Sequence, residues 1–377
     1  MTPAPTRYCL NAQTRYAATE FQNMTAMNTS LRAGSMLTAL FMTMALTACG
    51  GGGGDSSPTP PAPPSTTVSP PSTSPTRADF ALAASAPTPT YAASSSESTA
   101  FALTNTARAG AGAGLVAQNT KLDAAAAAHV NYLALNGIAG GLHNETPGLQ
   151  GFTGATEVDR DQAVGYGTNV TEVANVTSST SPADCVNELL DTVYHQNAML
   201  ESWRDVGIAY GTLPTVGNYT VCVMEFGTQA RAFAQFADAG TVASYPFAGQ
   251  TGITDSFMPS VEDPNPAPDL GSAQVGFPVR VSMVDYGSQT AAGRTYTVTQ
   301  FQLTDSQGTA VRSRLIASTA TVGSGVTLTV DPQGYLQAGE VFLMPLSPLT
   351  SGMTYTATFA GTGGATAYAK TWSLSTR

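Results

Sequence analysis

The sequence predicts an α+β fold, in which a domain of mixed helices and strands precedes an all-β sandwich. Helical spacing of apolar residues occurs only before about residue 237. After that point, short alternating runs bounded by Gly, Asp, Ser or Pro indicate strands and turns. Most of the first 97 residues lack the periodic apolar residues that a packed core requires, so the folded part is smaller than the 377-residue chain.

The N-terminal part of the chain has the features of an export leader. Residues 36–48 form an apolar run after Arg32, and this run is shorter than the roughly 20 residues that span a bilayer. The run ends in Leu46-Thr47-Ala48-Cys49, which resembles a bacterial lipobox. Cys49 is therefore expected to become the lipid-modified N-terminus of the mature protein. An ordinary cleavage site beside an incidental cysteine is the alternative.

The position of this leader predicts a misassigned translation start. A signal peptide normally begins a few residues before its basic region, yet 31 residues precede Arg32. Translation is therefore expected to begin at Met24 or Met27, and residues 1–48 are interpreted as a signal peptide with extra residues before it. Cys9 is then lost with the leader or is never made.

Residues 49–97 are predicted to form a lipid-anchored linker. Five glycines at 50–54 precede a stretch rich in Pro, Ser and Thr, which has too few apolar residues to offset its chain entropy. Such a segment is semi-extended where proline dominates, so it holds the next domain away from a membrane. Gly50 stands where an acidic residue would favour the inner membrane, so the outer membrane or cell surface is the expected location in the cell envelope.

Two helices are predicted at the start of the folded part. Phe101, Leu103 and Ala107 open the apolar pattern, and apolar residues then recur at helical spacing over 122–135. The second segment is nearly all alanine, which implies close helix packing, and Asn136-Gly137 is a suitable stop.

A third helix and two strands are predicted next. Residues 182–200 have the pattern of a helix with Ser181 as its N-cap. Residues 206–210 and 219–226 have the pattern of strands joined by a turn at 214–218. The first domain is thus expected to mix helices and strands.

The rest of the chain has the pattern of a β-sandwich. Alternating runs occur at 279–284, 296–303, 326–330, 341–345 and 354–359. Five or more short strands separated by turns predict a sandwich that is Ig-like in the broad sense. The segments 349–355 and 370–374 also resemble the end of bacterial Ig-like domains of surface proteins. We expect residues 237–377 to form this Ig-like domain, which would act as a spacer or add stability.

Charge and cysteine content restrict the function. The net charge of -10 and the pI near 4.6 leave no basic surface for phosphates, so nucleic acid is not an expected partner. Cys185 and Cys222 remain in the folded part of the chain. An oxidising compartment favours a disulfide between these two cysteines.

Any imidazole-based site must use His129, His143 or His195, because the chain has three histidines. His129 lies in the alanine-rich helix, where a packed or capping role is expected, so it is left out of the predicted site. His143 follows the Gly140-Gly141 turn, where small residues let other groups approach. Without a shared context, His143 and His195 would each be ordinary polar side chains.

These segments together resemble the CAP superfamily of cysteine-rich secretory, antigen-five and pathogenesis-related proteins, in particular its short bacterial SCP-domain members. The segments that carry the resemblance are, in chain order, 103–108, 121–137, His143, 151–166, Thr171-Glu172-Val173-Ala174, 186–200, 206–210 and 219–227. The resemblance covers roughly residues 98–228. It implies an α-β-α sandwich for the domain at 98–236, in which His143, Glu172 and His195 line a cleft and the Cys185–Cys222 bridge stabilises its wall.

The sequence departs from the family pattern beside this cleft. Leu189 and Gln196 stand where bacterial members usually have Trp and Arg, and Val173 replaces the usual Asn. The second cavity glutamate of the family has no clear counterpart, and Glu188 and Asp191 are only nearby candidates. Three of the four cavity positions are therefore matched.

Two imidazoles and a carboxylate can serve as metal ligands or as an acid and base pair. His143 and His195 with Glu172 would suit Zn²⁺ or a similar ion, although their long spacing is not a compact metal signature. In acid–base work, Glu172 would orient one histidine. A covalent mechanism would also need a nucleophile, for which Ser202 and Thr192 are candidates only by their closeness in sequence.

The resemblance implies a non-enzymatic, extracytoplasmic binding module. Lipidated Cys49 would attach it to a membrane, and its unidentified ligand would be a lipid, a glycan or a protein. A metal-dependent hydrolase acting on envelope peptides or glycans is the first alternative. A purely structural surface protein with a vestigial cleft is the second.

Overall fold

The computed structural model describes residues 76–229, 233–290 and 294–377. The expected signal peptide, the lipobox with Cys49 and the linker up to residue 75 lie outside the described residues. Residues Thr76–Arg377 belong to one compact unit. A domain boundary between residues 236 and 237 stays a prediction.

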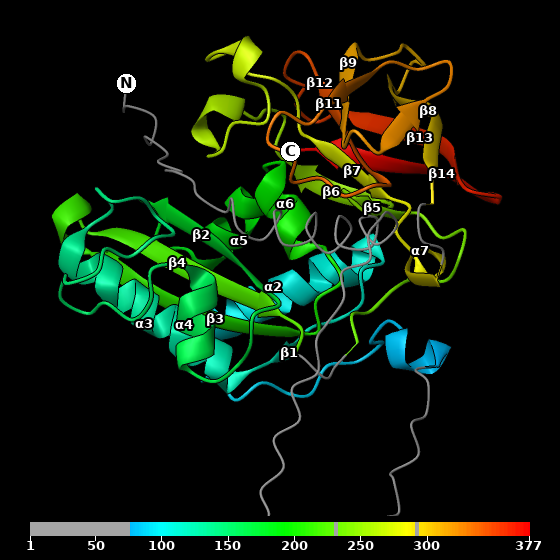
Figure 1. Ribbon diagram of the computed structural model, residues 1–377. Coiled ribbons are helices and arrows are strands. Elements are labelled where there is room, and N and C mark those ends of the chain that lie inside the picture. The colour runs from blue at the N-terminus through cyan, green and yellow to red at the C-terminus, as the bar shows by residue number, and fades with distance from the viewer. Residues whose placement is uncertain (1–75, 230–232, 291–293) are drawn as a thin grey trace, which may run out of the picture. The chain divides into compact units, whose positions relative to one another are not determined.

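The first part of the described chain is an α-β-α sandwich (Figure 1). Its elements are η1 (Arg77–Phe80), α2 (Ser96–Ala111), β1 (Ala117–Gln118), α3 (Thr120–Asn136), α4 (Glu157–Ala163), β2 (Val170–Thr177), α5 (Pro182–Leu190), α6 (Tyr194–Met199), β3 (Asp205–Leu213), η2 (Pro214–Val216) and β4 (Tyr219–Gly227). The sheet has the strand order β1-β3-β4-β2, with β4 antiparallel to both neighbours. The α+β fold class predicted from the sequence is confirmed.

Two hydrophobic layers hold the helices to opposite faces of this sheet. Apolar side chains of α3 pack with Ala174 and Val223 on one face. Those of α2 and α5 pack with Val173 and Met224 on the other face. Because neighbours in a strand point to opposite faces, Val173 and Ala174 contribute to different layers.

The alanine-rich helix packs closely on the sheet, as its composition predicts. A Cβ added at Gly207 of β3 would lie 2.1 Å from the backbone carbon of Leu122 in α3. Only a glycine in the strand and small residues in the helix permit this approach. The predicted helix stop is also confirmed, since α3 ends at Asn136 and Gly137 follows it with a φ of 72°.

The predicted helix at 182–200 is two helices, so this prediction was wrong in part. Helix α5 ends at Leu190, and α6 begins at Tyr194. Ser181 makes no side-chain capping hydrogen bond, although Pro182 occupies the first turn as expected. The amides that open α6 are instead satisfied by a distant carboxylate, which an analysis of local sequence cannot detect.

Residues from Thr76 onward are not a free linker, in contrast to the linker predicted for 49–97. The Arg77 guanidinium donates to the backbone oxygen of Phe236 at 2.9 Å, and the backbone amide of Ala83 donates to the Gln235 side chain at 2.8 Å. The Tyr91 hydroxyl donates to Asp123 at 2.5 Å. The low hydrophobicity of this segment did not predict its packing, because many of its contacts are hydrogen bonds between polar groups.

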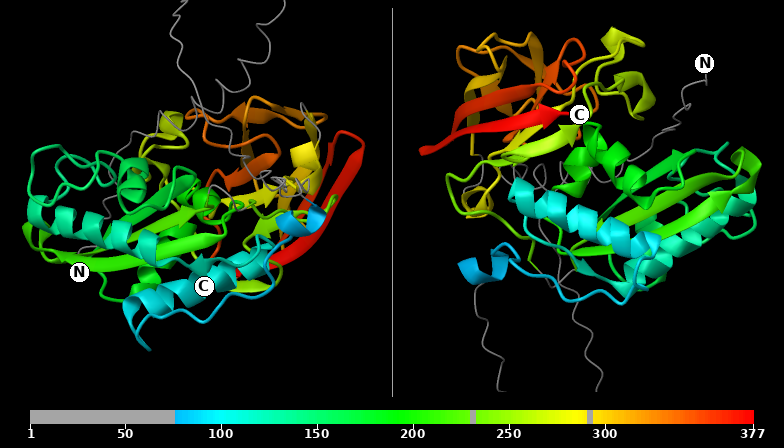
Figure 2. Two further views of the ribbon diagram at one scale, coloured as in Figure 1. Left: turned by 60° about the horizontal axis from the view of Figure 1, so that its bottom comes forward. Right: turned by 180° about the vertical axis from the view of Figure 1, so that it is seen from behind.

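An all-β region follows the sandwich (Figure 2). Its strands are β5 (Ala243–Tyr245), β6 (Gln250–Ile253), β7 (Val279–Ser282), β8 (Tyr296–Asp305), β9 (Ser313–Ala317), β10 (Thr321–Gly323), β11 (Leu328–Val330), β12 (Glu340–Pro345), β13 (Thr354–Gly363) and β14 (Thr366–Thr376). Its short helices are η3 (Pro259–Val261), η4 (Pro268–Leu270) and α7 (Tyr286–Thr290). The strands form two five-stranded sheets, ordered β10-β8-β13-β14-β6 and β11-β9-β12-β7-β5. An Ig-like relationship stays a prediction.

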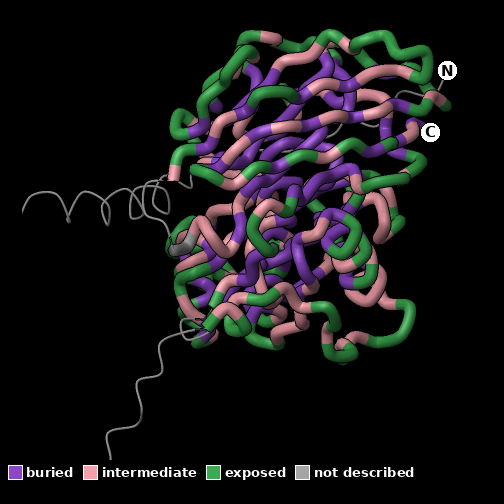
Figure 3. The backbone as a smooth tube through the Cα atoms, turned by 90° about the vertical axis from the view of Figure 1, so that its right-hand side faces the viewer, coloured by how far each residue is buried: buried purple, intermediate pink, exposed green. Residues whose placement is uncertain are grey.

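One hydrophobic core connects the all-β region with the α-β-α sandwich. Leu189 and Phe226 of the sandwich belong to the same cluster of buried side chains as Val279, Phe359 and Trp372. Figure 3 shows buried residues (purple) in the interior and exposed residues (green) mostly along the loops. Among the described residues, no helix has the length and apolar character needed to cross a membrane.

Candidate functional site

The three side chains predicted from the sequence lie together in the structure. His143 comes from the loop after α3, Glu172 from β2 and His195 from α6. The His143 Nδ1 atom lies 2.7 Å from Glu172 Oε1, and the ring centroids of His143 and His195 are 6.4 Å apart. The side chain of His143 is 20% exposed, that of His195 8% and that of Glu172 1%. The rings of His143 and His195 are therefore the part of the site that is exposed to solvent.

Arg160 of α4 holds Glu172 from the buried side. Its Nη2 donates to Glu172 Oε2 at 2.5 Å, and its Nη1 donates to the backbone oxygen of His143 at 3.0 Å. Helix α4 begins with a capping box between Thr156 and Asp159, which places Arg160 in its first turns. One guanidinium thus fixes both the carboxylate and the loop that carries the histidine.

These contacts shift the pKa values of the ion pair in opposite directions. Burial alone would raise the pKa of Glu172, but the charges of Arg160 and the histidines hold it well below its usual value. Burial alone would lower the pKa of His143, but its hydrogen bond to Glu172 and the charge of that carboxylate raise it. Both shifts favour an ionised pair.

His129 also belongs to the charge network of the site, although the sequence analysis set it aside. Its Nδ1 lies 3.0 Å from Glu145 Oε1 and its Nε2 lies 2.8 Å from the backbone oxygen of Leu142. Both partners are hydrogen-bond acceptors. The His129 Nε2 is also 3.9 Å from Glu172 Oε1. The expected packed position is correct, and the ring also lies next to the site carboxylate.

Glu157 is a site carboxyl that the sequence analysis missed. It is the first residue of α4 and 7% exposed, and burial together with the charge of Glu172 raises its pKa. The charge of His143 opposes this shift, so Glu157 interacts electrostatically with both residues of the pair. The capping box at Thr156 was the available sequence signal, because it puts Glu157 in the first turn of a helix.

The two candidates proposed for this position lie elsewhere. Glu188 accepts a hydrogen bond from the Asn175 side chain at 2.8 Å. Asp191 lies in the turn between α5 and α6, and its charge raises the pKa of Tyr245.

Two further carboxyls lie beneath the site without hydrogen-bond partners among the described residues. Asp161 and Glu225 are both fully buried. Burial and the charge of Glu172 raise the pKa of Asp161 to about 8 and that of Glu225 well above its usual value. The shift favours the neutral acid form of Asp161 near pH 7.

His195 is held in a defined tautomer. Its Nδ1 lies 3.1 Å from Thr192 Oγ1 and 3.2 Å from Glu262 Oε1. The Thr192 hydroxyl donates its own proton to the backbone oxygen of Leu189 at 2.8 Å, so it accepts from the imidazole. The Glu262 carboxylate is a second acceptor close to the same nitrogen. Both neighbours favour a proton on His195 Nδ1.

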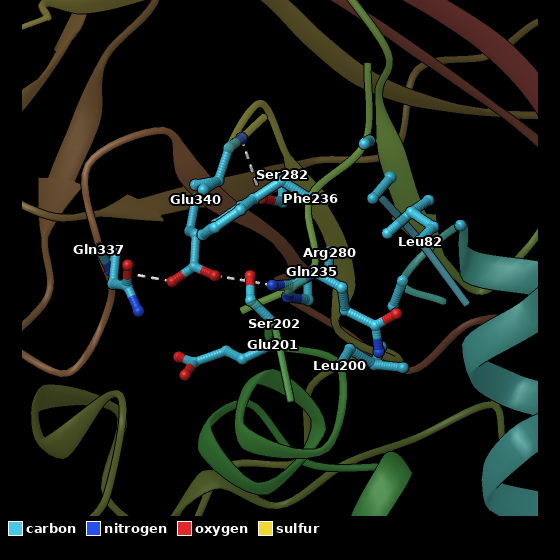
Figure 4. A pocket seen from close by; sticks show the side chains of 15 residues that line it. Leu82, Leu200, Glu201, Ser202, Gln235, Phe236, Arg280, Ser282, Gln337 and Glu340 are labelled. Atoms are coloured by element: carbon cyan, nitrogen blue, oxygen red, sulfur yellow. Dashed lines mark hydrogen bonds and ion pairs between the residues drawn. The ribbon is translucent and has the colours of Figure 1, made fainter. Parts of the chain in front are cut away.

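The contacts of Thr192 do not favour it as the nucleophile that the sequence analysis considered. Its hydroxyl donates to the backbone oxygen of Leu189, and a nucleophile needs a hydroxyl that donates to its base. The second candidate, Ser202, lines a different cavity of about 40 Å³ that also contains Gln235, Arg280 and Glu340 (Figure 4). Neither hydroxyl is activated by a site histidine.

The side chains do not fit the three-ligand pattern of a catalytic zinc site. The Nδ1 atoms of His143 and His195 are occupied by protein carboxylates, which leaves one nitrogen on each ring. Within the described residues, no group of three or more His, Cys, Asp or Glu side chains is placed to hold a metal ion. Catalytic zinc normally takes three protein ligands.

The predicted disulfide is present. Cys185 of α5 is bonded to Cys222 of β4, and their Cα atoms are 6.5 Å apart. The bond ties the helix layer to the central sheet at a position where both cysteines are buried.

Comparisons with known proteins give a family for part of the chain. Residues 101–225 match the sequence model of CAP, the cysteine-rich secretory protein family. This segment contains His143, Glu172 and His195 but not Glu262. Among solved structures, an outer surface protein from Borrelia burgdorferi is 16% identical, covers 37% of this chain and 96% of its own, and has a TM-score of 0.29. No curated protein matches the chain.

Proposed function

Because residues 101–225 form a domain of the CAP family, we propose that this protein is a non-enzymatic binding module that works outside the cytoplasm. Its ligand would be bound at the exposed edge of His143 and His195. The ligand class we favour carries hydroxyl groups, as the glycans of a cell envelope do.

The observation that carries this proposal is the pairing of two histidines, each with Nδ1 against a carboxylate. His143 is held by Glu172 and His195 by Glu262. A carboxylate on Nδ1 fixes the ring orientation and leaves the opposite nitrogen for an outside partner. Two such nitrogens on rings 6.4 Å apart suit a polar ligand with hydroxyl groups, which accept a hydrogen bond from the ionised His143 ring and can also donate one.

Binding accounts for these contacts better than catalysis does. A hydrolase that uses a protein nucleophile needs a hydroxyl whose proton a neighbouring histidine can accept, and Thr192 donates elsewhere. A metal-dependent hydrolase needs a ligand set that the described residues do not provide. The buried network around Arg160 instead holds the site in one arrangement.

We propose that Cys49 anchors the protein by a lipid, and that the outer membrane or the cell surface is its location. The lipobox-like sequence before Cys49 and the glycine after it support this proposal. Labelling of cells with a radioactive fatty acid tests it, because Cys49→Ser should abolish the label on this chain.

Cosedimentation with isolated peptidoglycan sacculi tests the function. We expect the full chain to bind sacculi, and the double variant His143→Ala, His195→Ala to bind at least about tenfold more weakly, since each lost hydrogen bond is worth about 1 kcal/mol. Arg314→Ala is the matched control, because Arg314 pairs with Asp269 at the surface of the all-β region. Phospholipid vesicles are the comparison probe.

Equal binding by the parent and the double variant would contradict a histidine site. Binding to vesicles alone would replace the polar ligand with a lipid surface. A Zn²⁺ titration by calorimetry covers the metal alternative, and one equivalent bound by the parent but not by the double variant would restore it.

A further inference from the structure

Helix α6, which carries His195, has no cap from its own sequence. Its N-cap residue is Val193, which has no polar side chain. The backbone amides of Val193, Tyr194 and His195 donate instead to the carboxylate of Glu262, at 2.9, 2.6 and 3.2 Å. Glu262 is 1% exposed. A buried carboxylate with three amide donors is strongly held in one position.

The same carboxylate sets the orientation of the His195 ring. Glu262 Oε1, which accepts from the Tyr194 and His195 amides, also lies 3.2 Å from His195 Nδ1. One side chain therefore caps the helix start and lies against the ring of its histidine. On the other half of the site, Glu172 does the same for His143 at 2.7 Å. The two histidines thus have matching carboxylate partners.

Glu262 comes from outside the segment that matches the CAP family. It follows η3 and stands 67 residues after His195. The surrounding chain is anchored in the all-β region, because the backbone of Phe257 pairs with that of Val275. Val193 and Tyr194 pack in one apolar cluster with Phe257. The Glu262 carboxylate is therefore delivered to α6 by the all-β region.

The later residues of α6 are held by the same region. The Asn197 side chain donates to Glu340 at 3.0 Å and accepts from Arg280 at 2.6 Å. Arg280 and Glu340 are ion-paired at 2.7 Å, and both line the small cavity in Figure 4. The Tyr194 hydroxyl donates to Asp331. Contacts from β7, β12 and the loop after β11 thus continue along the helix.

We infer that Glu262 is a positioning residue of the His143–His195 site, and that the all-β region is a structural part of that site. This inference rests on the proposed function, because only that proposal makes the two histidines a binding site. The contacts between Glu262 and His195 do not depend on any ligand. The all-β region is then more than the spacer that the sequence suggested.

The test uses the full chain with histidine labelled by ¹⁵N and the variant Glu262→Gln. An amide presents N–H groups to donors, so the ring and the backbone lose an acceptor. In the parent, we expect ¹⁵N chemical shifts that indicate a His195 ring with a proton on Nδ1. In Glu262→Gln, we expect shifts that indicate a mixture of tautomers. Hydrogen exchange of the peptide with residues 193–195 should become about tenfold faster, because hydrogen bonds to a charged group are lost.

Two further variants make the result specific. Glu262→Asp keeps the carboxylate and should restore most of the His195 signature. Asp269→Asn makes the same chemical change in the same region, at an ion pair with Arg314 in which the Asp269 side chain is 63% exposed, and should leave both readouts unchanged. The Asp variant also serves if the Gln variant does not fold.

Parent-like ¹⁵N shifts and exchange in Glu262→Gln would overturn the inference. So would a Glu262→Asp variant that folds but has the disturbed His195 signature of the Gln variant. Measuring the binding of the same variants to sacculi distinguishes the positioning role of Glu262 from the proposed binding function. A disturbed His195 with unchanged binding would contradict the proposed function and leave the positioning role of Glu262 standing.

Discussion

Arg160 neutralises a carboxylate that has almost no contact with water. The Arg160 and Glu172 side chains are 0% and 1% exposed, and Glu225 Oε1 lies 3.9 Å from the Arg160 Nη2 atom. Breaking a buried pair by removing one partner leaves the other charge without compensation. The contribution of Arg160 is therefore much larger than that of an arginine at the surface.

We expect Arg160→Ala to lower the free energy of unfolding by about 3 kcal/mol or more. Urea denaturation followed by circular dichroism measures this loss. Arg314→Ala, which breaks an exposed pair with Asp269, should cost less than about 1 kcal/mol. Equal losses for the two variants would show that Glu172 finds enough compensation from His143 and His129.

Asp161 makes stability depend on pH. Its pKa rises from an ordinary value of 3.8 to about 8 in the folded chain, because of burial and the nearby charge of Glu172. Between these values the folded chain holds a proton that the unfolded chain has released. The free energy of unfolding therefore falls as the pH rises from about 4 to about 8.

Asp161→Asn removes this dependence while keeping the size of the side chain. We compare the free energy of unfolding of the variant with that of the parent at each pH. This difference should shift in favour of the variant by more than about 1 kcal/mol between about pH 5 and about pH 8. Denaturation curves across this range provide the measurement. A difference that stays constant with pH would mean that Asp161 is ionised in the folded chain.

At the scale of elements, the Cys185–Cys222 disulfide joins α5 to β4 across 37 residues of chain. Closing a loop of this length restricts the unfolded chain by about 4 kcal/mol in the entropic treatment. The connected segment includes α6 and β3, so the bond restricts the part of the chain that carries His195.

The variant Cys185→Ala, Cys222→Ala should lose about 3 to 5 kcal/mol in urea denaturation. Reductant should lower the stability of the parent towards that of the variant and leave the variant unchanged. If reductant has no effect on the parent, the cysteines are not bonded in the protein as it is made.

At the scale of the whole molecule, the α-β-α sandwich and the all-β region share buried side chains. The two tryptophans report on the two parts, because Trp372 lies in β14 and Trp203 lies just before β3. Trp372 belongs to the common cluster, and Trp203 packs against it. A common core favours unfolding in one cooperative step.

Each of the variants Trp203→Phe and Trp372→Phe keeps a single tryptophan. We expect the fluorescence midpoint of each variant to match the midpoint that circular dichroism gives for the same variant. Fluorescence in urea provides the measurement. A fluorescence transition from one tryptophan that clearly precedes the other would show that the two parts unfold independently and that the all-β region is a separable domain.

Local patterns in the sequence determined the α+β fold class, the two sheet-forming regions and the alanine-rich helix, because these properties depend on neighbours within a few residues. The grouping of His143, Glu172 and His195 came instead from the resemblance to the CAP superfamily. The disulfide also followed from composition, since Cys185 and Cys222 were the only cysteines left in the folded part.

Only the tertiary structure decided how the site is held. Glu262 is far from His195 in sequence and has no motif around it, yet it caps α6 and fixes the histidine ring. Likewise, the capping of α4 positions Glu157, and Arg160 belongs to the site because it is buried beside Glu172. The physical reason is that charges and unpaired amides must be satisfied in space, by whichever part of the chain folding brings to them.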